Sequence, residues 1–119
     1  MTRDLLYVTH VLECIARIAR YTAGGRERFV ADEMAQDAVV RNLQVLAEST
    51  QKIGAETKAA HSEVEWRSIA GFRNVLVHNY LGLDVGEVWS IVETDLPRLG
   101  AQMRAIREEL AGESGQGVD

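Results

Sequence analysis

Cysteine and proline are almost missing from this sequence, and each scarcity excludes a class of protein. The 119 residues include one cysteine, Cys14, and one proline, Pro97. A single cysteine cannot form a disulfide within the chain, which favours a cytoplasmic protein over a small disulfide-stabilised secreted one. We expect Cys14 to be a small packing residue rather than a reactive thiol. The scarcity of proline, with abundant Ala, Leu, Glu and Arg, favours helices.

Long apolar runs and cofactor motifs are also missing. Charges interrupt residues 1–21, so we expect neither a signal peptide nor a membrane span there, and no membrane partner. No P-loop or dinucleotide-binding glycine motif is present. His61, Glu63 and Glu65 are close together, but H-S-E-V-E lacks the H-E-x-x-H spacing of zinc sites. We therefore predict no metal and no cofactor, and interpret His61 as a loop residue.

Positive charge is in the minority, since the formal net charge is −5. Attraction to phosphates dominates non-specific nucleic-acid binding, so an acidic chain is a poor binder of that kind. Any contact with RNA would need a local basic patch. Most of the cations are arginines, whose planar guanidinium suits phosphate oxygens, although a compositional preference would give the same count.

The apolar residues that are present recur at helical spacing. They predict an all-α fold, an antiparallel helical bundle of four main helices plus a short connecting helix. We expect the main helices near residues 4–22, 33–57, 63–80 and 85–110, with the connecting helix around 26–34. The length fits one domain, residues 1–111, followed by a disordered tail, residues 112–119.

Individual side chains refine these helices. The first helix has an apolar stripe, which Val11 and Ile18 widen towards Cys14, with His10 on the opposite, solvent-facing side; the stripe comprises Leu5, Val8, Leu12, Ile15 and Ala19. Asp32, Ser62 and Asp84 are expected to cap the three later helices. Pro97 should kink the last helix or divide it into two. The second main helix has a further face, made of Arg41, Val45 and Glu48, which would contact a partner or simply face solvent.

The stretch R-N-V-L-V-H-N-Y, residues 73–80, gathers polar groups beside apolar ones. On a helix, Asn74 and His78 share a face, and Arg73 lies about 100° to one side. Histidine transfers protons near neutral pH, arginine matches phosphate oxygens, and asparagine can orient either group. These parts suit metal-free cleavage of an RNA phosphodiester by its own 2′-OH. The spacing alone, however, favours an ordinary buried hydrogen-bond cluster or a solvated face.

Acid–base cleavage of this kind uses two proton carriers, whereas the stretch contains one histidine. A homodimer that brings two copies together across its two-fold axis would supply the second. The chemistry, if present, therefore predicts a homodimer with a shared cleft.

The run W-R-S-I-A-G-F-R-N-V-L-V-H-N-Y, followed by L-G-L-D-V-G-E-V-W-S-I-V-E-T-D-L-P-R-L, resembles the HepT family of HEPN-domain proteins. The family motif R-x4-H-x-Y is matched by Arg73, His78 and Tyr80. Asn74 fits the usual polar position after the arginine, and Glu48 stands where a glutamate is usual. The similarity covers about residues 3–110.

The resemblance implies a HEPN fold and the toxin part of a type VII-like HEPN/MNT toxin–antitoxin system. Such toxins are metal-independent RNA endonucleases that act as homodimers, so Arg73 and His78 would be catalytic and Asn74 would orient the substrate. The partner would be a minimal nucleotidyltransferase (MNT) antitoxin, which transfers AMP from ATP to the motif tyrosine, here Tyr80. The alternative is a non-catalytic helical module that binds such a nucleotidyltransferase.

Overall fold

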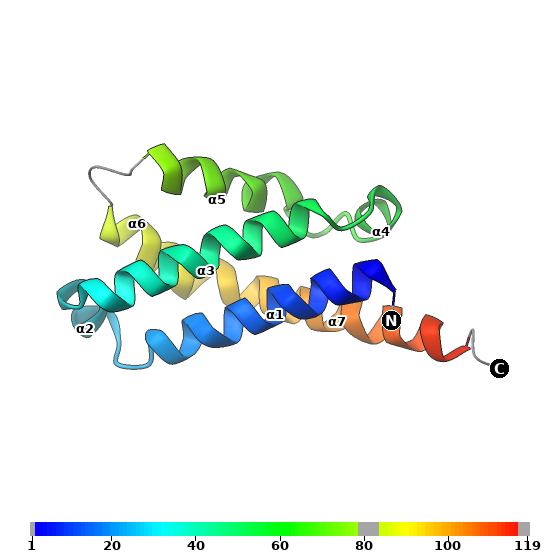
Figure 1. Ribbon diagram of the computed structural model, residues 1–119, viewed down its shortest axis with the longest axis horizontal. Coiled ribbons are helices and arrows are strands. Elements are labelled where there is room, and N and C mark those ends of the chain that lie inside the picture. Colours follow the sequence, from blue (N-terminus) through cyan, green and yellow to red (C-terminus); the bar gives the residue numbers. More distant parts are fainter. Residues whose placement is uncertain (1, 79–83, 117–119) are drawn as a thin grey trace.

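Long helices alternate with short ones along the chain (Figure 1). The computed structural model describes the backbone of residues 2–78 and 84–116, and their side chains except those of residues 74–78 and 113–116. The long helices are α1 (Arg3–Tyr21), α3 (Glu33–Gln51), α5 (Trp66–His78) and α7 (Leu96–Gln116). The short ones are α2 (Arg26–Ala31), α4 (Ala55–Ala60), α6 (Val85–Ser90) and a π-helix, Ile91–Asp95. The predicted all-α bundle is confirmed, with short helices in three connections instead of one. No described helix has the length and apolar character needed to cross a membrane.

Polar side chains fix where several helices begin. A carboxylate at the N-cap accepts a hydrogen bond from one of the backbone N–H groups that the first turn leaves unpaired. The carboxylate of Asp32 accepts from the N–H of Ala35 at 3.1 Å. That of Asp84 accepts from the N–H of Glu87, also at 3.1 Å. Both predicted caps are confirmed.

The connection between α3 and α5 differs from the prediction. α3 ends at Gln51 rather than near residue 57, because Asp4 of α1 binds the chain that follows. Its carboxylate accepts from the Gly54 N–H at 3.0 Å and from the Thr57 hydroxyl at 2.6 Å. The predicted Ser62 cap is wrong as well, since α5 begins at Trp66, beyond a turn.

The hydrophobic core lies where α1 packs against both α3 and α7. Its most deeply buried residues come from all three helices and have no exposed surface: Val8, Val11, Cys14, Val39, Leu43, Leu46, Met103 and Ile106. Burying one such aliphatic side chain stabilises the fold by about 1.5–3 kcal/mol. The predicted widening of the α1 stripe is confirmed, since Val11, Cys14 and Ile18 are buried, whereas the placement of Ala19 in the stripe is wrong because Ala19 is exposed. The buried face is wide because α1 packs against two neighbours, α3 and α7.

The last part of the chain is divided, as Pro97 predicts. α6 and α7 are joined through the π-helix, in which the N–H of Leu96 donates to the carbonyl of Ile91. Pro97 has no N–H to donate to the carbonyl of Glu93, so a regular α-helical ladder cannot pass this point. α7 then continues to Gln116, past the predicted end at Leu110, so residues 112–116 have a helical backbone, while residues 117–119 of the predicted tail lie outside the described residues.

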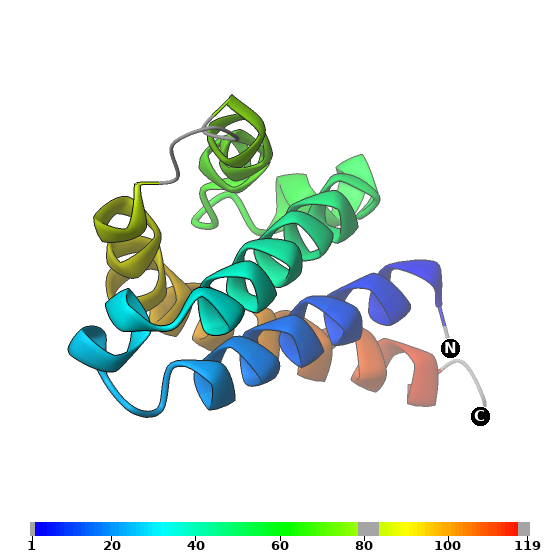
Figure 2. The ribbon, with the colours of Figure 1, turned by 60° about the vertical axis from the view of Figure 1, so that its left-hand side comes forward.

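α5 is held in a different way from the other long helices. It packs extensively against α3 alone, whereas α1 lies between α3 and α7. Figure 2 shows α5 standing apart from α7 on the far side of α3. α7 therefore covers the flank of α5 that faces it only loosely.

Candidate functional site

The last two turns of α5 carry the polar motif. Arg73, Asn74 and His78 all have helical backbone, so Asn74 and His78 lie on one face, one turn apart. The side chains of Asn74 and His78, and the whole of Tyr80, lie outside the described residues. The structure thus brings the three predicted positions together on one helix end, and leaves the geometry of their side chains as a prediction.

Arg73 occupies an unusual position for an exposed cation. It follows Ile69 by four residues and Trp66 by seven, and therefore lies on the face of α5 that packs against the bundle. Ile69 is buried and Trp66 is half-buried, yet Arg73 is exposed. No described carboxylate lies within ion-pairing distance of its guanidinium. An exposed guanidinium without a carboxylate partner is available to bind a phosphate.

The start of α5 is fixed by its tryptophan. The indole N–H of Trp66 donates to the backbone carbonyl of His61 at 3.0 Å. The ammonium group of Lys58 lies 5.7 Å from the centre of a Trp66 ring, within cation–π range. These contacts join the first turn of α5 to the end of α4, and so set the direction in which α5 leads to the motif.

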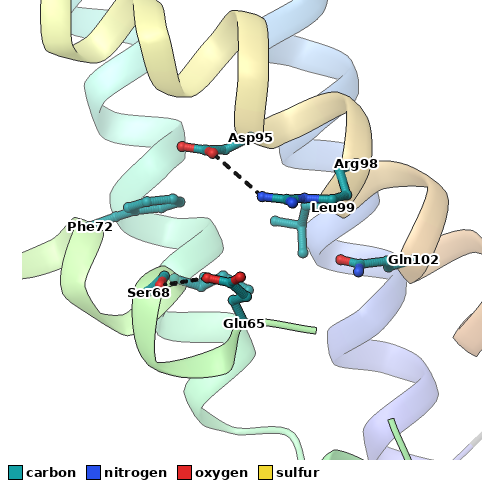
Figure 3. A pocket seen from close by; sticks show the side chains of 8 residues that line it. Glu65, Ser68, Phe72, Asp95, Arg98, Leu99 and Gln102 are labelled. Carbon is teal, nitrogen blue, oxygen red and sulfur yellow. Dashed lines mark hydrogen bonds and ion pairs between the residues drawn. The ribbon is translucent and has the colours of Figure 1, made fainter. Parts of the chain in front are cut away.

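A groove runs beside α5, on the flank that faces α7 (Figure 3). It has a volume of about 180 Å³ and is lined by Glu65, Ser68, Ile69, Phe72, Asp95, Arg98, Leu99 and Gln102. Phe72 and Leu99 form apolar walls, while Asp95 and Arg98 face each other across 3.9 Å at its rim. Phe72 immediately precedes Arg73 in the chain, but Arg73 does not line the groove. A groove with apolar walls and a charged rim is suited to contact with another protein surface rather than to binding a phosphate.

Sequence reasoning missed the contacts of two histidines, each of which reaches a distant segment. His10 is half-buried, and its Nδ1 lies 3.2 Å from the Ser49 hydroxyl of α3, so the predicted solvent-facing position is wrong. His61 is also largely covered, and its two ring nitrogens contact Glu63 at 3.4 Å and Glu109 of α7 at 3.2 Å. Both contacts hold helices together. Glu48, by contrast, is exposed on α3.

Cys14 is a core residue, as predicted. Its side chain is completely buried, and this burial raises the pKa of the thiol, an effect that nearby Arg17 partly opposes. A thiol that is kept neutral and covered is a poor nucleophile. Cys14 therefore takes no part in the candidate site.

Comparison with known proteins identifies the family. The model of the Ribonuclease HepT-like family matches residues 11–106, which include the whole motif, and the chain belongs to this family. A protein of Thermococcus cleftensis named "Probable ribonuclease HepT" is 33% identical over 86% of this chain and 94% of its own. A "Putative RNase" of Caldanaerobacter subterraneus subsp. tengcongensis is 33% identical over 87% of this chain and 93% of its own.

A further relative is longer. It is named "Gamma-glutamylcyclotransferase and putative RNase", comes from Methanocaldococcus jannaschii, and is 32% identical over 92% of this chain. The present chain spans half the length of that relative. No solved structure shows a significant match.

Proposed function

We propose that this chain is a metal-independent RNA endonuclease and the toxin of a HEPN/MNT toxin–antitoxin pair. One observation carries the proposal. The family match contains the complete R-x4-H-x-Y motif, and the arginine of that motif is exposed and has no described carboxylate beside it. The RNA substrate would be met in the cytoplasm.

The proposed chemistry uses the substrate's own hydroxyl. His78 removes the proton of the ribose 2′-OH, and that oxygen attacks the adjacent phosphorus. The new O2′–P bond forms as the P–O5′ bond breaks, and the departing 5′ oxygen takes a proton. The products are a 2′,3′-cyclic phosphate and a free 5′-OH. Arg73 binds the phosphate oxygens and stabilises the additional negative charge, while Asn74 orients the reacting groups.

The second proton carrier would come from a second copy of the chain. α5 packs extensively against α3 alone, and the groove on its flank has half-buried Phe72 in its wall. An interface at this flank would place two copies of α5 near a two-fold axis, with a histidine on each. This arrangement supports a homodimer whose two motifs share one cleft.

The proposed control acts on Tyr80. This residue comes two positions after the end of α5 at His78. A partner nucleotidyltransferase would transfer AMP from ATP to the Tyr80 hydroxyl: the phenol oxygen bonds to the α-phosphorus and pyrophosphate leaves. This would add a phosphate two residues beyond the histidine of the motif. The attached group would occupy the phosphate-binding position and repel RNA.

RNA cleavage by the purified chain tests the proposal. We expect wild type to cleave a fluorescent single-stranded RNA in the presence of EDTA, leaving 2′,3′-cyclic phosphate ends. Arg73→Ala and His78→Ala should each lower the rate by at least about 10²-fold. Arg67→Ala, an exposed arginine two turns earlier on α5, is the matched control and should retain activity. Cleavage that survives His78→Ala would contradict the assigned chemistry.

A second candidate function is favoured by the net charge of −5. An acidic chain repels RNA over much of its surface, and this is compatible with a non-catalytic module that binds a minimal nucleotidyltransferase. That function predicts a stable complex with the nucleotidyltransferase and no RNA cleavage by wild type. Growth of cells that express the chain without the partner separates the two, since only the nuclease would arrest growth in a His78-dependent manner.

A further inference from the structure

Positive charge is concentrated at one corner of this acidic protein. Residues 17–28 run from the end of α1 through the turn into α2, and they include Arg17, Arg20, Arg26 and Arg28 but only one acidic residue, Glu27. The segment therefore has a formal charge of +3, and the rest of the chain must carry −8 to give the total of −5. No described carboxylate lies within ion-pairing distance of these arginines. Such a local basic patch is what RNA contact requires in a chain of this charge.

The corner contains a cavity as well as charge. The cavity has a volume of about 320 Å³ and is lined by Arg20, Tyr21, Ala23, Gly24, Gly25, Arg28, Phe29, Asp32 and Ala35. Arg20 and Arg28 are exposed, and 39% of the Tyr21 surface is accessible. Asp32 is the one carboxylate in the lining, and it accepts a hydrogen bond from the N–H of Ala35. Two guanidiniums beside an accessible phenol ring are the groups that bind phosphates and stack on bases.

The absence of a side chain at Gly24 leaves room for the Arg28 side chain. A Cβ atom added to Gly24 would lie 2.5 Å from Cδ of Arg28, so the arginine side chain runs across the bare backbone of this glycine. Gly25 has a φ of 90°, a conformation that other residues rarely adopt. The paired glycines thus shape the turn and let the Arg28 side chain pass close over it. Arg20 and Arg28 each lie in the last turn of a helix and complement its C-terminal dipole, but that role does not require a cavity between them.

The basic corner lies at the same end of the bundle as the motif. Phe29 of α2 packs against Trp89 of α6, with ring centroids 5.5 Å apart. α6 follows Asp84, which is six residues after His78, the last residue of α5. A chain of this length spans at most about 20 Å, and Figures 1 and 2 show α2 and α6 together at this end. A single RNA strand that enters the motif could therefore continue over α6 to the corner.

We infer that the corner formed by Arg20, Tyr21 and Arg28 is a second binding site, which holds the phosphate backbone of single-stranded RNA away from the scissile bond. The inference rests on the proposed function only for the identity of the ligand. The guanidiniums contact phosphates and Tyr21 stacks on a base, so the corner contributes affinity without choosing a sequence.

Equilibrium binding of RNA tests the inference without requiring cleavage. The probe is a fluorescein-labelled oligouridylate of about 12 nucleotides, within the range of one single-strand binding surface. It is titrated with the full chain carrying His78→Ala, so that the RNA stays intact, and anisotropy gives Kd at several salt concentrations. The test variant adds Arg20→Gln and Arg28→Gln. The matched control adds Arg67→Gln and Arg104→Gln, two exposed arginines outside the corner, which change the net charge equally.

Each phosphate contact contributes about 0.7 to the slope of log K against log salt for single strands, so losing two should lower the slope by about 1.4. At about 0.1 M salt this corresponds to a Kd roughly 25-fold higher. The control pair should change Kd by less than about threefold. Tyr21→Ala should raise Kd about tenfold. Gly24→Ala, which keeps both charges but displaces Arg28, should raise Kd several-fold while circular dichroism shows the helices retained.

Equal effects of the two double variants would overturn the inference, because net charge alone would then explain binding. The inference would also be overturned if none of the proteins bound RNA. It would likewise be overturned if the Arg20→Gln/Arg28→Gln substitutions weakened the binding of ATP, added as a competitor, but left the binding of RNA unchanged. Each result is distinct from failure of the proposed function. Cleavage is measured separately on the chain with His78 intact, and RNA cleavage with an unimportant corner would leave the nuclease proposal standing.

Discussion

α5, the helix that carries the motif, packs extensively against one neighbour only, so we expect it to unfold locally when that contact is weakened. Ile69 is 4% exposed and is the one buried side chain among the described residues of α5, where it packs against the core. Ile→Ala in a core costs about 2–5 kcal/mol, and we expect about 2–3 kcal/mol here because the adjacent groove lets neighbouring groups relax. Since α5 packs extensively only against α3, the substitution should lower the free energy of local unfolding of α5 more than the free energy of global unfolding.

Hydrogen exchange followed by mass spectrometry measures this difference directly. A loss of 2–3 kcal/mol corresponds to roughly 30- to 140-fold faster exchange of residues 66–78, with little change in residues 3–21. Ile106→Ala is the control, because Ile106 is fully buried in the core that α1 and α7 share, and its loss should accelerate exchange in both segments. Equal acceleration of both segments by Ile69→Ala, or none in α5, would refute the proposed independence of the motif helix.

Substitutions at three further positions test separate parts of the structure. Trp66→Phe leaves the His61 carbonyl without its indole donor and should lower the free energy of unfolding by about 1–3 kcal/mol in urea titrations; an unchanged midpoint would contradict the bond. Asp84→Ala should cost about 1 kcal/mol through loss of the cap of α6, while Asp84→Asn, which also caps helices, should restore most of it. Burial raises the pKa of Cys14, so the unfolded chain releases this proton at lower pH than the folded one, and stability should fall as pH rises from 8 to 10. Cys14→Ala should remove that part of the decline, and an identical pH profile in the variant would contradict the assignment.

Local patterns predicted the parts of the fold that depend on neighbouring residues. The caps at Asp32 and Asp84 and the interruption at Pro97 are each decided within one turn of helix. The end of α3 was predicted too late, because Asp4, fifty residues earlier, accepts hydrogen bonds from Gly54 and Thr57. No pattern within the α3 segment reveals a partner on α1.

The candidate site was predictable to a similar extent. Spacing correctly placed Arg73, Asn74 and His78 on one helix. It could not show that Arg73 is exposed on a face that is otherwise buried, since this depends on how α5 meets α3. His10 was placed in solvent because its contact, Ser49, lies on another helix.

Mixing active and inactive subunits tests most directly whether two copies of the motif act in one cleft, as we propose. Wild type and His78→Ala, combined in equal amounts in denaturant and refolded together, should assort at random into dimers. If both histidines are needed, only about one quarter of the dimers cleave RNA, and the wild-type protein shows about half the activity it has when refolded alone. Activity that stays proportional to the amount of wild type would contradict a shared cleft.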